Sequence, residues 1–308
     1  IVFGAGIGLA QPSLPRLMRV RFPGRVGVTT GIYASGMVTG SIVAASVTGP
    51  IVERIGEPSA WRTPLALWGV LAVAALLVWT AAMRPWRGDT DATAAPGDVS
   101  AVISNASVWS PWRDRRSWIA AWFFAAQGLI YHLFVAWLPT IYHEAGASAA
   151  AVAGMFAVFN AATLPAILLF PAWSDRMRRR RPPSIVAALF VLGGVLGLLF
   201  WPLADPWRWF WPALAGAGVS GLFAMGLVLP ADIAPAGRTG VTAGMVLAVG
   251  YVGSALGPIL AGALRDLTGS FAITLATLPI LAAVSIVLAA IAPELPRRSE
   301  FLELAERT

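Results

Sequence analysis

The 308-residue sequence has no cysteine, no lysine and few charged residues of any kind. Without cysteine it can form neither a disulfide framework nor a thiolate metal site. Only 12% of the residues are charged, against roughly 25% in an ordinary soluble domain. Fifteen acidic and 22 basic side chains cannot cover the surface of a soluble chain of this length. These shortages exclude a water-soluble globular protein.

The apolar residues make up 57% of the chain and gather in stretches of membrane-spanning length. Arg16 is the only permanently charged residue inside these stretches, and it lies near the end of one. We therefore predict an all-α integral membrane protein with the lipid bilayer as a partner and with no cofactor or metal. The nine predicted spans are 1–18, 28–50, 63–83, 118–141, 151–172, 184–204, 210–231, 240–264 and 271–292.

All 22 basic residues are arginines, and they favour one side of this topology. Eighteen lie in loops and ends on one side, and only Arg54, Arg62, Arg208 and Arg265 lie on the other. Positive loops remain in the cytoplasm, so we expect a bacterial inner-membrane protein with a cytoplasmic C-terminus. The net charge of +7 then reflects membrane insertion, and we expect no nucleic-acid partner.

One long polar segment divides the spans into two groups. Residues 84–117 contain a stretch rich in Gly, Asp, Ala and Pro, followed by a segment rich in Trp and Arg. We interpret the first part as a flexible tether and the second as an interfacial segment. The predicted domains are 1–83, the linker 84–117, a six-helix bundle over 118–292 and a tail over 293–308.

A seven-residue pattern occurs twice. Arg25-Val-Gly-Val-Thr-Thr-Gly31 precedes the second span, and Arg238-Thr-Gly-Val-Thr-Ala-Gly244 precedes the eighth, 213 residues later. Repetition after six spans indicates two parallel six-helix halves. The spans then correspond to helices 4 to 12 of a twelve-helix fold, and we expect three further helices upstream of Ile1.

This organisation resembles the major facilitator superfamily, and within it the family of cyanate and 2-nitroimidazole transporters (CynX/NimT). The resemblance implies two helical bundles that transport a solute by alternating access. It is carried by Gln11-Pro-Ser-Leu-Pro15, Phe22-Pro-Gly-Arg25, Ala60-Trp61-Arg62, Leu67-Trp68, Gln127 with Tyr131, Ala136-Trp137-Leu138-Pro139, and Gly250-Tyr251 through Gly257-Pro258 to Asp266-Leu-Thr-Gly269.

The segment from Pro171 to Arg180 resembles the superfamily's loop signature, with Pro171 and Arg178 in place of the usual glycines. The resemblance implies that Asp175 faces the N-terminus of a neighbouring helix and pairs with arginine, which latches the cytoplasmic gate. The alternative is that these arginines only enforce topology. The predicted gating residues are Asp175, Arg176, Arg25 and Arg238.

Glycines and a proline recur in the eighth span in a spacing that resembles the superfamily's antiporter motif. Because that motif normally lies on helix 5, we interpret the copy as a device for packing and bending, and it is no evidence for antiport. The residues are Gly244, Gly253, Gly257 and Pro258.

Polar side chains at mid-span are the candidate solute-binding residues, because an unpaired polar group in hydrocarbon is costly. Gln127 and Tyr131 share a face of one helix, and His132 is the embedded group that titrates nearest neutrality. Each has a structural alternative: a hydrogen bond between helices, an interfacial anchor, or a histidine bonded to a backbone carbonyl. The full set is Gln127, Tyr131, His132, Trp137, Asn160, Tyr251 and Gln11.

These features favour a secondary active transporter for a small organic or anionic solute, cyanate-like or nitroimidazole-like. We expect a monomer, and a coupling proton is an option for which His132 is the candidate carrier. The alternatives are an efflux carrier of another superfamily branch and a membrane interaction protein without transport. An enzyme is disfavoured because the sequence has no Ser/His/Asp set, no phosphate-binding loop, and no paired acids or base with usable spacing at a membrane face.

Overall fold

The computed structural model describes residues 24–56, 62–93, 110–201, 203–235 and 238–294, together with residue 59 and several positions between 6 and 22. In this part of the chain every regular element is a helix, and there is no strand. The elements are α2 (Val26–Ile55), α3 (Arg62–Thr93), a short 3-10 helix η1 (Pro111–Arg113), α5 (Arg115–Glu144), α6 (Ala149–Met177), α7 (Arg181–Phe200), α8 (Trp207–Ile233), α9 (Thr239–Thr268) and α10 (Ala272–Ile291).

Seven of these helices, α3 and α5 to α10, are long and apolar enough to cross a membrane. The second predicted span, 28–50, is covered by the 30-residue helix α2. The first, 1–18, lies largely outside the described residues. The predicted all-helical membrane fold is therefore confirmed, and most helices extend a turn beyond their apolar stretch because polar residues complete their ends.

The chain forms two compact units. One contains Ile1–Val38 and Pro111–Thr308, and the other contains Thr39–Ser110. The first unit therefore includes the beginning of α2 together with all helices from α5 to α10, and it holds every functional residue discussed below.

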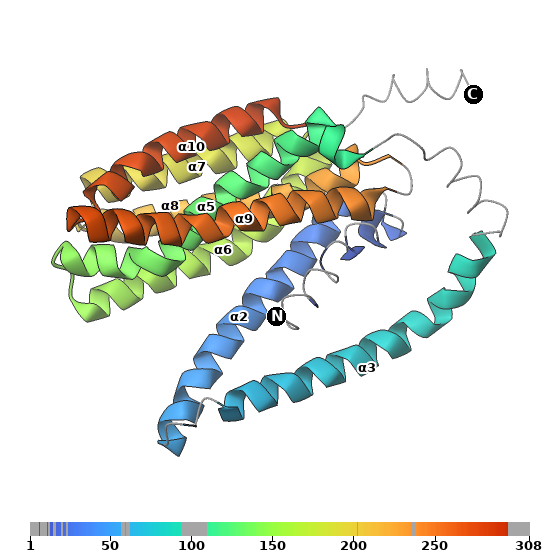
Figure 1. The fold of residues 1–308 in the computed structure, drawn as a ribbon, viewed down its shortest axis with the longest axis horizontal. Coiled ribbons are helices and arrows are strands. Elements are labelled where there is room, and N and C mark those ends of the chain that lie inside the picture. The colour runs from blue at the N-terminus through green and yellow to red at the C-terminus, as the bar shows by residue number, and fades with distance from the viewer. Residues whose placement is uncertain are drawn as a thin grey trace. The chain divides into compact units, whose positions relative to one another are not determined.

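Helix α8 lies at the centre of the first unit, where it contacts α5, α6, α7 and α9 (Figure 1). Small residues let these backbones approach closely. A Cβ atom added to Gly216 would lie 2.2 Å from the carbonyl oxygen of Phe159 on α6, and one added to Gly218 would lie 2.6 Å from the amide nitrogen of Val191 on α7. Neither position tolerates a larger residue without separating the helices.

Glycines also bring α9 against α5. A Cβ on Gly253 would lie 2.8 Å from the Cβ of Ala125, and one on Gly257 would lie 2.6 Å from the carbonyl oxygen of Leu129. Gly244, which we expected in the same stripe, has open space around its Cβ position. Nine residues at about 100° each place Gly244 on the face opposite Gly253, so it does not share the contact with α5.

The second unit contains the end of α2 and the helix α3. Trp68 Nε1 donates a hydrogen bond of 3.2 Å to Thr48 Oγ1 and so ties the two helices together. Helix α3 continues to Thr93, beyond the predicted span end at residue 83 and into the predicted tether. Residues 94–109 of that linker lie outside the described residues.

The last part of the predicted linker is an ordered entry into α5. Asp114 caps this helix by accepting hydrogen bonds from the backbone amides of Arg116 and Ser117. Trp118 Nε1 donates to the carbonyl oxygen of Trp112 at 2.9 Å, and the two rings meet edge to face. Asp114 and the contact between Trp112 and Trp118 thus define where α5 begins.

Candidate functional site

A buried arginine organises the turn between α6 and α7. Arg180 is 2% exposed, and its guanidinium pairs with two carboxylates. Its Nη1 donates to Asp175 Oδ1 at 2.6 Å, and its Nε donates to Asp232 Oδ2 at 2.7 Å. Ser174 Oγ accepts a further hydrogen bond of 2.9 Å from Nη1. One side chain therefore joins the end of α6 to the end of α8.

Asp175 also contacts the first turn of α2. The backbone N–H of Val28 donates to Asp175 Oδ2 at 2.9 Å. The carboxylate thus lies where the helix dipole and unpaired amide groups favour negative charge. Gly27 makes this approach possible, because a Cβ at that position would lie 2.5 Å from Asp175 Oδ1. We refer to Asp175, Arg180, Asp232 and the Val28 amide as the latch.

The local sequence explains why the α6–α7 turn is tight. Helix α6 ends at Arg178, whose backbone is left-handed with φ of 52°. The amides of Arg178 and Arg179 return to the carbonyl oxygens of Asp175 and Ser174. This turn brings Arg180 within ion-pairing distance of Asp175 and Asp232.

Helix α7 begins without a side-chain cap of its own, and the end of α10 supplies one. Glu294 accepts hydrogen bonds from the backbone amides of Arg180 at 2.6 Å and Arg181 at 3.1 Å. Arg181 Nε donates in return to the carbonyl oxygen of Ala292 at 2.7 Å. The ends of α6, α8 and α10 are thereby joined at one end of the unit, which we call the latch end.

The charges of the latch are nearly balanced. Burial alone would lower the pKa of Arg180, but the carboxylates of Asp232 and Asp175 outweigh burial and raise that pKa above its ordinary value. The second carboxylate leaves an excess negative charge, which the N-terminus of α2 and the nearby Arg19 offset. Arg180 thus stays protonated at any physiological pH.

Arg19 makes a second link at the latch end. Its Nη1 donates to the carbonyl oxygens of Ala231 and Ala234, the latter at 2.8 Å. These carbonyls belong to the C-terminal end of α8, where the helix dipole favours a cation. The segment that precedes α2 is thus bonded to α8, as α2 itself is bonded to α6.

Of the predicted gating residues, Asp175 is part of the latch and the three arginines are not. Asp175 faces a helix N-terminus and pairs with an arginine, but that arginine is Arg180 rather than Arg176, Arg25 or Arg238. Arg176 and Arg25 are exposed. Sequence reasoning missed Arg180 because it lies in a run of five neighbouring arginines that also satisfies the positive-inside rule.

The two copies of the repeated pattern form the same turn. Thr29 Oγ1 donates to the carbonyl oxygen of Arg25 at 3.0 Å, and Thr242 Oγ1 donates to that of Arg238 at 3.0 Å. The backbone amides of the same threonines donate to the same carbonyls, at 3.0 and 3.1 Å. Arg25 and Arg238 therefore hold equivalent places before α2 and α9.

Two of the predicted solute-binding residues come together with a tyrosine that sequence analysis did not select. The side chain of Gln11, 8% exposed, lies close enough to Tyr33 on α2 and Tyr251 on α9 to affect both phenol groups, and its Nε2 donates to Met37 Sδ at 4.0 Å. The ring of Tyr251 meets Phe124 of α5 edge to face, with centroids 5.7 Å apart. We call Gln11, Tyr33 and Tyr251 the glutamine cluster. Tyr33 lies two residues after the repeated pattern, and that position is the sequence signal that it lies near the latch.

The candidates on α5 point to different neighbours. Gln127 is buried, 3% exposed, one turn beyond Phe124. Tyr131 stacks on Phe159 of α6 at 6.3 Å and contacts the His132 ring. His132 Nδ1 lies 2.8 Å from the carbonyl oxygen of Gly128, the backbone bond given above as its structural alternative.

Trp137 and Asn160 have structural partners. Trp137 Nε1 donates to the carbonyl oxygen of Pro258 at 3.0 Å, and its ring lies against Phe271. Asn160 Nδ2 donates to the carbonyl oxygen of Phe156 in its own helix at 2.8 Å. Trp137 therefore joins α5 to α9 at Pro258, and Asn160 is bonded locally.

Comparison with known proteins places these observations in a family. The model of the Major Facilitator Superfamily matches residues 1–258. Similar curated proteins are an uncharacterized transporter, YycB, of Bacillus subtilis (28% identity over 88% of this chain and 64% of that protein), the cyanate transport protein CynX of Escherichia coli (28%, 87% and 66%) and the 2-nitroimidazole transporter of Escherichia coli (26%, 91% and 68%). The chain thus spans about two thirds of the length of these relatives.

A solved structure shares the fold. The proton:xylose symporter XylE aligns with a TM-score of 0.68 at 15% identity, over 88% of this chain and 65% of that one. At this identity the match establishes the fold alone.

Proposed function

The chain belongs to the major facilitator superfamily, and on that premise we propose that it acts as a secondary active transporter that works by alternating access. It is a multi-pass membrane protein whose relatives are transporters and not enzymes. The proposal assigns 1–83 to the first bundle, 118–292 to the second and 84–117 to the linker between them. It places the latch end and the C-terminus in the cytoplasm of a bacterium.

The observation that carries this proposal is the bond between Asp175 and the Val28 amide. Asp175 belongs to the second predicted half and Val28 to the first, so the bond joins the two halves at the latch end. Alternating access requires the halves to separate at each end in turn. The contact depends on the Asp175 carboxylate and on its close approach to Gly27. It can therefore be broken and remade without rearranging α2 or α6.

We propose that the solute binds at the glutamine cluster. Its amide and two phenol groups come from both predicted halves and offer donors and acceptors without a net charge. This chemistry suits a small planar or linear solute with several acceptor atoms, such as cyanate or a nitroimidazole. The transport of those two compounds by relatives at 26–28% identity supports the same solute class.

The test is uptake of labelled cyanate and of labelled 2-nitroimidazole into membrane vesicles that contain the full-length protein. We expect saturable uptake of at least one, a several-fold higher KM in Gln11→Ala, and little change in Asn160→Ala, whose amide is bonded within its own helix. Equal KM values in both variants would remove the glutamine cluster from the solute site. Absence of uptake for both compounds, with export of unrelated drugs instead, would favour the efflux-carrier alternative.

A further inference from the structure

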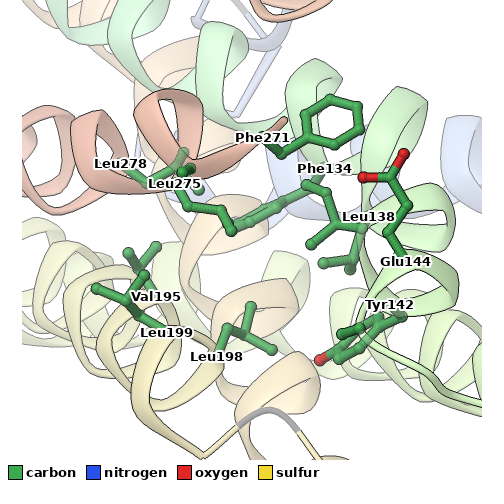
Figure 2. A pocket seen from close by; sticks show the side chains of 13 residues that line it. Phe134, Leu138, Tyr142, Glu144, Val195, Leu198, Leu199, Phe271, Leu275 and Leu278 are labelled. Atoms are coloured by element: carbon green, nitrogen blue, oxygen red, sulfur yellow. The ribbon is translucent and has the colours of Figure 1, made fainter. Parts of the chain in front are cut away.

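A cavity of about 270 Å³ lies inside the first unit, at the end opposite the latch end. Its walls come from α5 and α7 where these helices end and from α10 where it begins (Figure 2). Phe134, Leu138, Leu198 and Leu278 are among the apolar side chains that line it. The volume is just below the roughly 300–1,000 Å³ of typical small-molecule sites.

One buried hydroxyl group faces this cavity without a partner. Tyr142 is 2% exposed, and its hydroxyl has no hydrogen-bond partner in the described part of the chain. Figure 2 shows that hydroxyl pointing toward Leu198, across the cavity from the α5 backbone. Because buried hydroxyl groups are nearly always bonded, a group that enters from outside is the expected partner.

The cavity has a polar edge. Glu144, at the end of α5, contributes to the lining and forms an ion pair of 2.7 Å with Arg265 Nη2. Both side chains are 38% exposed, so this edge reaches water rather than the middle of the apolar layer. The guanidinium also lies over the ring of Phe271, 5.5 Å from its centre. The pair leaves the edge with no net charge.

We propose that the cavity binds a neutral, mostly apolar molecule with one hydrogen-bonding oxygen, such as a medium-chain alcohol. Water is a poor occupant, because a buried water needs two to four polar partners and the inner wall offers only the Tyr142 hydroxyl. A carboxylate is disfavoured because the lining is apolar and Arg265, the cation at its edge, is already paired with Glu144. The exposed ion pair favours entry from the aqueous side over insertion of a lipid tail. This site is independent of the glutamine cluster and of the transported solute.

The experiment is photolabelling of the full-length protein in lipid nanodiscs with a diazirine derivative of octanol. We expect saturable labelling of peptides that contain Tyr142 or Leu275, competed by octanol and at least about tenfold less by octanoate. Tyr142→Phe should weaken octanol binding about three- to tenfold, the equivalent of one hydrogen bond. Leu275→Trp should fill the cavity and abolish labelling.

Ile280→Trp is the matched control, since Ile280 lies on the same helix and is 64% exposed. It should label like the unmodified protein, and thermal unfolding confirms that each variant is folded. Labelling that does not saturate, or that persists in Leu275→Trp, would overturn the proposal. A bound phospholipid that native mass spectrometry finds in the other variants but not in Leu275→Trp would also overturn it, because the occupant would then be a lipid tail. Unchanged octanol affinity in Tyr142→Phe would overturn the hydrogen-bonding role.

Discussion

The N-termini of α2 and α9 have the same seven-residue pattern and the same local hydrogen bonds, yet their surroundings differ. At α2 the turn is covered by α6: Asp175 bonds to Val28, and a Cβ on Gly31 would lie 2.9 Å from the carbonyl oxygen of Ile167. At α9 the corresponding Val241 is 54% exposed, and a Cβ on Gly244 would meet nothing within 4 Å.

In the described part of the chain, the same pattern thus has a close neighbour at α2 and open space at α9. Arginine, threonine and two glycines form a turn that presents backbone amides and leaves room for a close neighbour. Whether a carboxylate occupies that room depends on a residue about 150 positions away in the sequence. Substitutions at the two turns and at their neighbours test this difference.

The largest effect is expected from removal of Arg180. Arg180→Ala leaves Asp175 and Asp232 buried and unpaired, which should destabilise the protein by about 3–5 kcal/mol. The Val28 amide still bonds to Asp175 in this variant, so the effect reports the loss of the arginine that neutralises the two carboxylates. Thermal unfolding in detergent measures the loss, and Arg179→Ala, at an exposed neighbour, is the control. Equal melting temperatures for the two variants would contradict the role given to Arg180.

Smaller changes in stability, of opposite sign, are expected at the equivalent positions Gly31 and Gly244. Gly31→Ala should destabilise by about 1–3 kcal/mol, because the new methyl group meets the α6 backbone. Gly244→Ala should be neutral or stabilising by up to about 1 kcal/mol, since alanine favours helix and the space is open. The difference between the two melting temperatures is the informative quantity, and a difference of zero would mean that α6 does not cover the α2 turn.

The smallest effect should be equal in both copies. Thr29→Val and Thr242→Val each remove a hydroxyl that donates to an arginine carbonyl, worth about 1 kcal/mol or less; Thr29 Oγ1 also lies 3.1 Å from the Val26 carbonyl oxygen, an acceptor that competes for the same proton. Unfolding of the two variants side by side checks this. A clearly larger loss at one position would show that its threonine has a partner beyond the local turn.

Much of the fold was predictable because it depends on local composition. Span positions and the repeat follow from hydropathy and short patterns, and the place of Asp175 at a helix N-terminus followed from the resemblance of its segment to the superfamily's loop signature. Other contacts join segments that are distant in the sequence, and no local pattern specifies them. They include the ion pair of Arg180 with Asp232, the bond from Trp137 to α9 and the approach of Gln11 to Tyr33. Which face Gly244 occupies depends on the helix geometry and not on the glycine spacing alone: it lies opposite Gly253, where the described part of the chain has open space.

The central claim, that the latch end must open during transport, is tested most directly by locking it. A Cβ on Gly31 would lie 3.4 Å from the Cα of Leu168, so cysteines at these two positions can form a disulfide between α2 and α6 once α2 shifts slightly away from the carbonyl oxygen of Ile167. The chain has no other cysteine, so Gly31→Cys with Leu168→Cys gives a single defined crosslink that leaves Asp175 in place. We predict that oxidation stops solute uptake and that reduction restores it. Uptake that continues at an unchanged rate in fully crosslinked protein would contradict the claim.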